Sequence, residues 1–115
     1  MRAQSAKAKG RRLQQFVRDA VLKLFTSLTS DDVRSTGMGQ SGVDVQLSQA
    51  AKKLFPYSVE CKNKERMNIW RELEQAVENT EPDTKPLLVM TKNRTDTYAV
   101  IQFDHFMELL SEKRD

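Results

Sequence analysis

The centre of the sequence holds a strand-like stretch, Tyr57-Ser58-Val59-Glu60-Cys61-Lys62. Successive side chains of a strand point to opposite faces, so Glu60 and Lys62 share one face while Val59 and Cys61 take the other. A second strand-like stretch spans residues 42–47, where Asp44 is the polar member of an apolar alternation. A carboxylate from each of two paired strands, with an ammonium group beside them, suits a hard divalent cation that acts on phosphate.

The segments around these two stretches predict one α/β domain. Apolar side chains at three- and four-residue spacing indicate helices after residue 10, over 65–79 and from 104 onward, and further strands are expected at 33–36, 87–90 and 98–103. The order α-β-β-β-α-β-β-α favours a mixed five-stranded sheet with helices on both faces. We expect Trp70 in the core, with base stacking as the alternative, and Phe106, Leu109 and Leu110 to face inward from the last helix.

Positive charge is concentrated at the start of the chain. The net charge is +3, yet residues 1–30 carry seven lysines and arginines against Asp19 alone, a net +6, which leaves −3 for the rest. Residues 1–10 are small and basic and are expected to form a flexible arm before the domain at 11–115. A basic arm and first helix indicate phosphate contacts made from one end of the molecule, or simply a solvated tail.

Composition excludes several kinds of site. No stretch is apolar enough to span a membrane, and no apolar segment follows the basic N-terminal residues, so neither a span nor a signal peptide is expected. Cys61 is the only cysteine, which fits a reducing compartment, and we expect a cytoplasmic protein of a cell or of a virus-infected cell. His105 is the only histidine, so a zinc site of His and Cys ligands or a histidine-based triad is not expected.

The arrangement of Asp44, Glu60 and Lys62 resembles the signature of the PD-(D/E)xK nuclease superfamily, and the predicted order of elements over residues 10–110 is similar to the core of that restriction-endonuclease-like fold. The resemblance implies an endodeoxyribonuclease that depends on Mg²⁺ or Mn²⁺. Asp44, Glu60 and the backbone carbonyl of Cys61 would bind the metal, and Lys62 would orient the attacking water. A plain surface ion pair between Glu60 and Lys62 is the alternative for this pattern.

The same resemblance makes two glutamines candidate site residues. Many members carry an acid on the first helix, and Gln14 occupies the most similar position here. Glutamine binds metal poorly, so this departure implies one metal ion instead of two, or a ligand taken from elsewhere. Some members also place a glutamine on the helix after the Glu-x-Lys motif, a part that Gln75, or otherwise Glu72, would play.

Small archaeal and phage Holliday-junction resolvases are the subgroup that the chain resembles, with a basic first helix and Ser/Gly-rich sequence before Asp44. In those enzymes a loop serine assists cleavage, for which Ser41 and Ser35 are the candidates here. The likeness implies a homodimer acting on DNA, including four-way junctions. Further candidates for nucleic-acid contacts are Arg11, Arg12, Arg34, Ser35, Lys64 and Gln75.

Two other functions stay open at this point. A DNA-binding protein that retains the nuclease fold without catalysis is favoured by Gln14, whereas the intact Asp44, Glu60 and Lys62 favour an enzyme. A toxin-like or defence nuclease acting on RNA is the other, because no residue pattern here separates ribose from deoxyribose.

Overall fold

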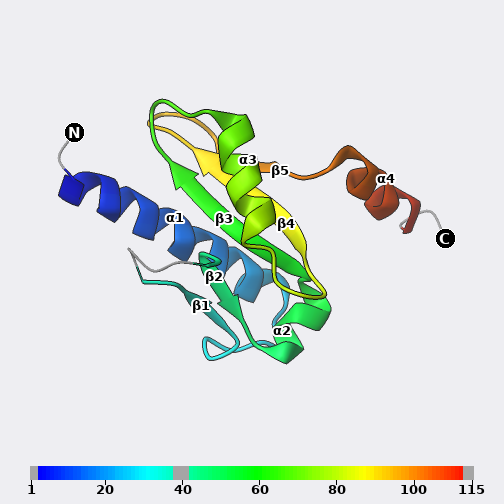
Figure 1. Cartoon of the computed structure of the whole chain (residues 1–115). Helices are drawn as coiled ribbons and strands as arrows, with labels where there is room; N and C mark the ends of the chain where they lie inside the picture. Colours follow the sequence, from blue (N-terminus) through cyan, green and yellow to red (C-terminus); the bar gives the residue numbers. More distant parts are fainter. Residues whose placement is uncertain (1–2, 38–41, 113–115) are drawn as a thin grey trace.

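The computed structural model describes residues 3–37 and 42–112 (Figure 1). The elements are α1 (Ala3–Leu24), β1 (Val33–Ser35), β2 (Val45–Leu47), α2 (Gln49–Leu54), β3 (Tyr57–Asn63), α3 (Ile69–Glu78), β4 (Lys85–Thr91), β5 (Tyr98–Val100) and α4 (Phe103–Glu112). The predicted α/β class is confirmed. Within the described residues, no helix combines the length and the apolar character that crossing a membrane requires.

Among the described residues the strands form two sheets, so the predicted single five-stranded sheet is wrong. β1 pairs antiparallel with β2, while β3 pairs parallel with β4 and β4 antiparallel with β5. The sheets meet where the Asp44 N–H donates to the Val59 carbonyl at 2.9 Å. At the next outward-facing amide of β3, the Cys61 N–H donates to the Asp44 carboxylate at 2.6 Å. Because a side chain takes this amide, the backbone ladder stops there and the sheet divides.

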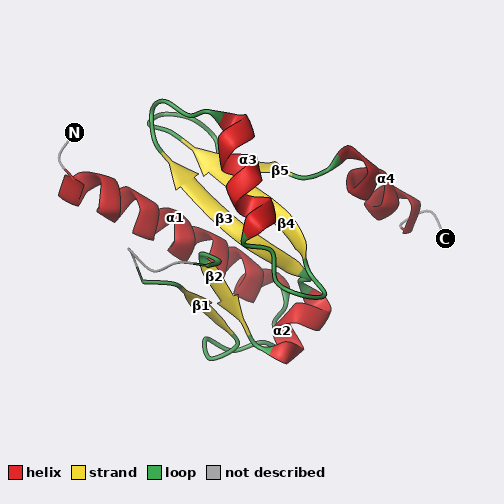
Figure 2. Cartoon of the chain, viewed as in Figure 1, coloured by secondary structure: helices red, strands yellow, loops and turns green. Residues whose placement is uncertain are grey.

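The helices cover the larger sheet on both faces (Figure 2). From α1, Leu13, Val17 and Val21 pack in one buried cluster with Val59 and Cys61 of β3. Helix α3 lies over the opposite face, toward which Glu60 points. Both Leu88 and Val89 of β4 are buried, because this strand lies between β3 and β5 and is covered on both faces.

The start of the first helix differs from that predicted. Helix α1 begins at Ala3 and runs through Gly10, although residues 1–10 were expected to form an arm before the helix. Alanine is the best helix former, and the alanines at positions 3, 6 and 8 offset the cost of about 1 kcal/mol for an interior glycine. The structure also contains a short helix between β2 and β3, α2, where the Ser48 hydroxyl caps the Ala51 N–H at 3.1 Å.

The predicted core positions of Trp70 and of the last helix are wrong. Trp70 is 77% exposed, because α3 turns Glu72 and Ala76, not Trp70, toward the sheet. Glu72 is held there by the ammonium groups of Lys62 and Lys64. Phe106, Leu109 and Leu110 are also exposed, because α4 projects from the side of the molecule (Figure 2) and contacts it through His105, which meets Tyr57. The buried residue of α4 is His105.

Candidate active site

Six of the residues chosen from the sequence meet around one polar cavity of about 330 Å³. It lies between the N-terminal half of α1, the segment before β2, the middle of β3 and the end of α3. The lining residues are Gly10, Gln14, Gly42, Asp44, Glu60, Cys61, Lys62, Gln75, Glu78 and Asn79. Gln14, Asp44, Glu60, Lys62 and Gln75 therefore share one space, although 61 positions separate the first from the last.

Asp44 is fixed to β3 by its main chain and its side chain together. Its N–H donates to the Val59 carbonyl, and its Oδ2 accepts the Cys61 N–H at 2.6 Å. Its own carbonyl accepts the Thr36 N–H at 2.8 Å, which ties it to the end of β1. These bonds hold the Asp44 carboxylate at the edge of β3, the strand that carries Glu60.

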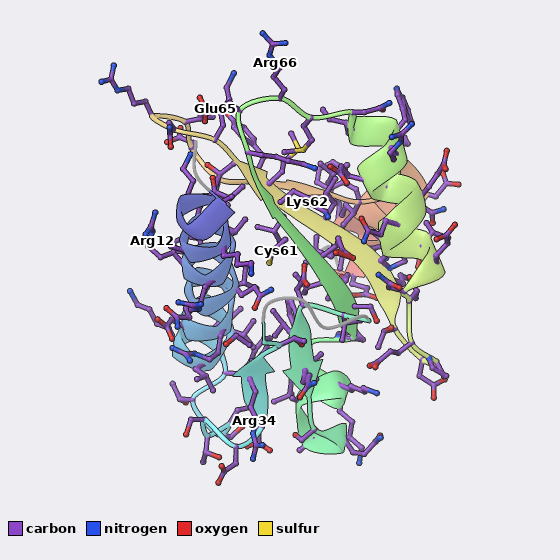
Figure 3. All side chains as sticks on the ribbon, turned by 60° about the vertical axis from the view of Figure 1, so that its left-hand side comes forward. Arg12, Arg34, Cys61, Lys62, Glu65 and Arg66 are labelled. Carbon is purple, nitrogen blue, oxygen red and sulfur yellow. The ribbon has the colours of Figure 1, made fainter. Side chains whose placement is uncertain are left out.

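The carbonyl of Cys61 points toward the same edge. The N–H and C=O of one strand residue project to the same side of the strand, and the Cys61 N–H points to Asp44. The thiol lies on the other face, between α1 and β3 (Figure 3), where burial, helped by the charges of Asp44 and Glu60, raises its pKa. Cys61 thus offers the cavity a backbone oxygen and keeps its sulfur in the core, as the resemblance implied.

Glu60 is a buried acid, with only 4% of the residue exposed. Its Oε1 accepts a hydrogen bond from Asn79 Nδ2 at 3.1 Å, and its Oε2 lies 3.9 Å from Lys62 Nζ. Burial, followed by the charge of Asp44, raises the pKa of Glu60 from 4.5 to about 7, although Asn79 and Lys62 act in the opposite direction. Burial and the neighbouring charge of Asp44 therefore oppose ionisation of Glu60.

Lys62 is shared between two acids. Besides Glu60, its Nζ lies 3.6 Å from Oε1 of Glu72, a residue buried on the inner face of α3. The second oxygen of Glu72 pairs with Lys64 Nζ at 2.6 Å. Glu72 therefore joins Lys62 of β3 to Lys64, the residue just after the end of that strand, and the sequence had offered Glu72 only as the alternative to Gln75. The Glu60–Lys62 contact is thus part of a largely buried group, not the plain surface ion pair considered above.

The other predicted contact residues do not line this cavity. Arg34 lies at the far end of the molecule from Lys62 and pairs with Asp31 at 3.5 Å (Figure 3), and Ser35 is its neighbour on β1. Arg12 points away from Lys62 (Figure 3). Ser41 falls outside the described residues.

Helix geometry separates the two arginines of α1. Residues three or four apart share a helix face, so Arg11 lies beside Gln14 on the side of the cavity. Arg12 is two positions from both Gly10 and Gln14, which places it on the other side of the helix. Both arginines are exposed.

Asn79 is the functional candidate that sequence reasoning missed. It ends α3, where its backbone N–H bonds to the Gln75 carbonyl, and its amide reaches Glu60. Only its place at the end of a predicted helix was visible in the sequence. Nothing local shows that this end returns to the middle of β3.

The described residues contain no group of three or more His, Cys, Asp or Glu side chains arranged to hold a metal ion. The donors that lie together beside β3 are the carboxylates of Asp44 and Glu60 and the carbonyl of Cys61, while Glu78, a further acid of the lining, is exposed on α3. Mg²⁺ commonly binds through one or two carboxylates and keeps several of its waters, so this set suits such an ion.

Comparison of the chain with protein-family models, with curated proteins and with solved structures found no match. The reading of the cavity therefore depends on its own geometry.

Proposed function

We propose that this chain is a divalent-metal-dependent nuclease that hydrolyses phosphodiester bonds in DNA. The observation that carries the proposal is the meeting of Asp44 and Glu60, from two different strands, beside Lys62 in one polar cavity. An ion pair on a strand surface needs neither a second acid at its side nor burial. Here the acid is buried, and the cavity opens onto a basic helix.

The proposed metal ligands are Asp44, Glu60 and the Cys61 carbonyl, with Mg²⁺ or Mn²⁺ as the ion. The raised pKa of Glu60 supports this, because a cation between the two carboxyl groups would favour their ionised forms. When bound, such an ion supplies charge neutralisation at the phosphate and a more acidic water. Because Gln14 on α1 stands where many relatives of the resembled family carry an acid, we propose one ion instead of two.

The protein groups around this position have distinct tasks. Lys62, with its ammonium between Glu60 and Glu72, stabilises negative charge that develops on the phosphate and orients the attacking water. Asn79 holds the Glu60 carboxylate in one orientation. Gln14 and Gln75 present amide groups that hydrogen-bond phosphate oxygens or water at the cavity wall.

Structure-selective cleavage, including cleavage of four-way junctions, is the finer proposal. Sequence readout needs side chains that reach base edges, and this chain has little beyond the elements that form the cavity. The exposed basic residues of α1 offer phosphate contacts that any branched or linear DNA satisfies. The lone, buried cysteine is consistent with a cytoplasmic location, which belongs to the same proposal.

The experiment is cleavage of a labelled synthetic four-way junction beside matched linear duplex, single strand and an RNA of the same sequence, with Mg²⁺, Mn²⁺ or EDTA. We expect metal-dependent cutting that is lost in Glu60→Gln and Lys62→Met. Arg12→Ala serves as the control, because it changes a charge on the far side of α1. Cutting of every DNA substrate would support the nuclease activity but contradict the preference for junctions. Cutting of RNA alone would show that the substrate is RNA and not DNA.

A second candidate is a DNA-binding protein that has lost catalysis, favoured by Gln14 at the cavity wall. This reading predicts tight binding of the junction with no cleavage by any metal. In that case Gln14→Glu would be the variant to test, since an added acid supplies the missing charge. Cleavage gained by Gln14→Glu would support lost catalysis, and cleavage by the wild-type chain would exclude it.

A further inference from the structure

Helix α4 turns its polar face toward its own chain. The hydroxyl of Tyr57 and Nε2 of His105 are 2.5 Å apart, and their rings lie 5.4 Å apart between centroids. Glu108 and Glu112 follow His105 at three and seven positions, on the same helix face. Their charges add to burial in raising the pKa of Tyr57, which agrees with this orientation.

The apolar residues of α4 consequently face away from the body. Phe103 is 72% exposed, and the other exposed apolar residues are Phe106, Met107, Leu109 and Leu110. An amphipathic helix normally gains its stability by burying its apolar stripe. In this chain the apolar stripe of α4 stays exposed, so it is available to bind another surface.

A matching groove lies on the outer side of α3. It has a volume of about 670 Å³ and lies between α3, β4 and the end of β5. Trp70, Leu73 and Val77 form one wall, and Pro86, Val100 and Ile101 form the other. Trp70 and Val77 are both largely exposed, so the groove is apolar and open.

The helix of the same copy cannot fill this groove. Phe103, its first residue, already lies at the groove edge, and only Ile101 and Gln102 connect β5 to α4. Two residues span too little distance to reverse a ten-residue helix onto α3. Short connections of this kind favour the exchange of an element between two copies.

The exposed area suits a second copy. Trp70, Phe103 and Phe106 together expose roughly 400 Å², since a large aromatic side chain carries about 150–250 Å². Val77, Met107, Leu109 and Leu110 bring the surface toward the ~800 Å² that each partner contributes to a stable interface.

We propose that two copies of this chain exchange helix α4, each laying its apolar face into the groove lined by Trp70 and Val77 of the other. The exchange is reciprocal, so one two-fold axis relates the copies and both grooves are filled. This inference does not depend on nuclease activity, and its test uses no substrate.

The test is the molar mass in solution, by light scattering after size-exclusion chromatography. The wild-type chain is expected to have twice the mass of one copy. Val77→Glu damages the groove alone and Leu110→Glu damages the helix alone, and each is expected to give a monomer with an unchanged far-ultraviolet circular dichroism spectrum. Both side chains are exposed in one copy, so neither change removes a core contact. Leu24→Glu, on the exposed face of α1, is the control and is expected to stay dimeric.

Mixing the two variants tests the reciprocal contact. A Val77→Glu copy has an intact helix and a Leu110→Glu copy has an intact groove, so their mixture is expected to form a dimer through one intact contact. A monomeric wild-type chain at about 100 µM, roughly a hundred times a micromolar Kd, would overturn the proposal. So would a dimer that survives both glutamates, a dimer that only Leu24→Glu disrupts, or a mixture that stays monomeric.

Discussion

The Asp44 carboxylate accepts the backbone N–H of Cys61 at 2.6 Å, and this one bond serves both the fold and the site. It occupies the amide that follows the backbone bond from the Asp44 N–H to the Val59 carbonyl, so strand pairing does not continue from that bond and the sheets stay separate. It also sets the carboxylate beside Glu60 and the Cys61 carbonyl. The residue that interrupts the sheet is thus the one proposed to bind metal.

Two substitutions of Asp44 are expected to separate these roles. Asp44→Asn keeps an oxygen that can accept the Cys61 N–H, so we expect near wild-type stability with loss of metal-dependent cleavage. Asp44→Ala leaves the buried N–H unpaired, which costs about 1–3 kcal/mol in addition. Urea denaturation and cleavage assays on the two variants measure the difference. Equal stability of Asn and Ala variants would contradict the structural role.

The stability of the metal-free protein should depend on pH through Glu60. Its pKa is about 7 in the folded protein and 4.5 is its ordinary value, so the folded state holds the proton more tightly. Folding stability therefore falls as pH rises from about 4.5 to about 7 and changes little from this group above that range. Glu60→Gln should lack this component, since it has no proton to release.

Urea denaturation in EDTA at pH 4.5, 6, 7 and 8.5 measures the effect as the difference in free energy of unfolding between the wild type and Glu60→Gln. Comparing the two chains cancels the contributions of other acids. Added Mg²⁺ should stabilise the wild type more at pH 8.5 than at pH 6, because binding requires the ionised acid. A difference that does not vary with pH would contradict the raised pKa.

The alternation around Glu60 and Lys62 was readable from the sequence because a strand dictates which neighbours share a face. That rule placed the acid, the lysine and the inward Cys61 correctly. The division of the sheet was not readable, since it depends on whether a backbone carbonyl or the Asp44 carboxylate takes the Cys61 N–H. Both arrangements have the same pattern of apolar residues.

Helix periodicity has a similar limit. It showed that α4 has an apolar face, but it did not show what covers that face, so Phe106 and Leu110 were wrongly placed in the core. Trp70 was misplaced for a related reason. The apolar pattern of α3 did not take Glu72 into account. Its pairing with Lys62 and Lys64 directs the Glu72 side of the helix, and not Trp70, toward the sheet.

Asn79 is expected to act as a positioning residue for Glu60. Asn79→Ala removes a hydrogen bond that lowers the pKa of Glu60, so that pKa should rise further and the pH profile of cleavage should shift upward. Loss of such a supporting bond typically weakens metal binding about 10–100-fold. The measurements are Mn²⁺ titration by calorimetry and cleavage rate against pH.

Asn68→Ala is the matched control at the other end of α3. The Asn68 side chain caps the Arg71 N–H at 3.2 Å, and losing a cap costs about 1 kcal/mol without touching Glu60. If both variants lose stability but neither shifts the pH profile of cleavage, Asn79 stabilises the end of α3 and does not position Glu60.

The two arginines of α1 should differ in their contribution to DNA binding. Arg11 lies on the cavity side of the helix and Arg12 on the other side, pointing away from Lys62 (Figure 3). Arg11→Ala should weaken binding several-fold and reduce the slope of log K against log salt by about 0.9, the value for one lost phosphate contact. Arg12→Ala should leave the slope unchanged. Fluorescence anisotropy with a labelled duplex at several salt concentrations measures both, in EDTA so that no cleavage occurs. Equal losses from the two variants would mean that DNA does not approach α1 from the cavity side.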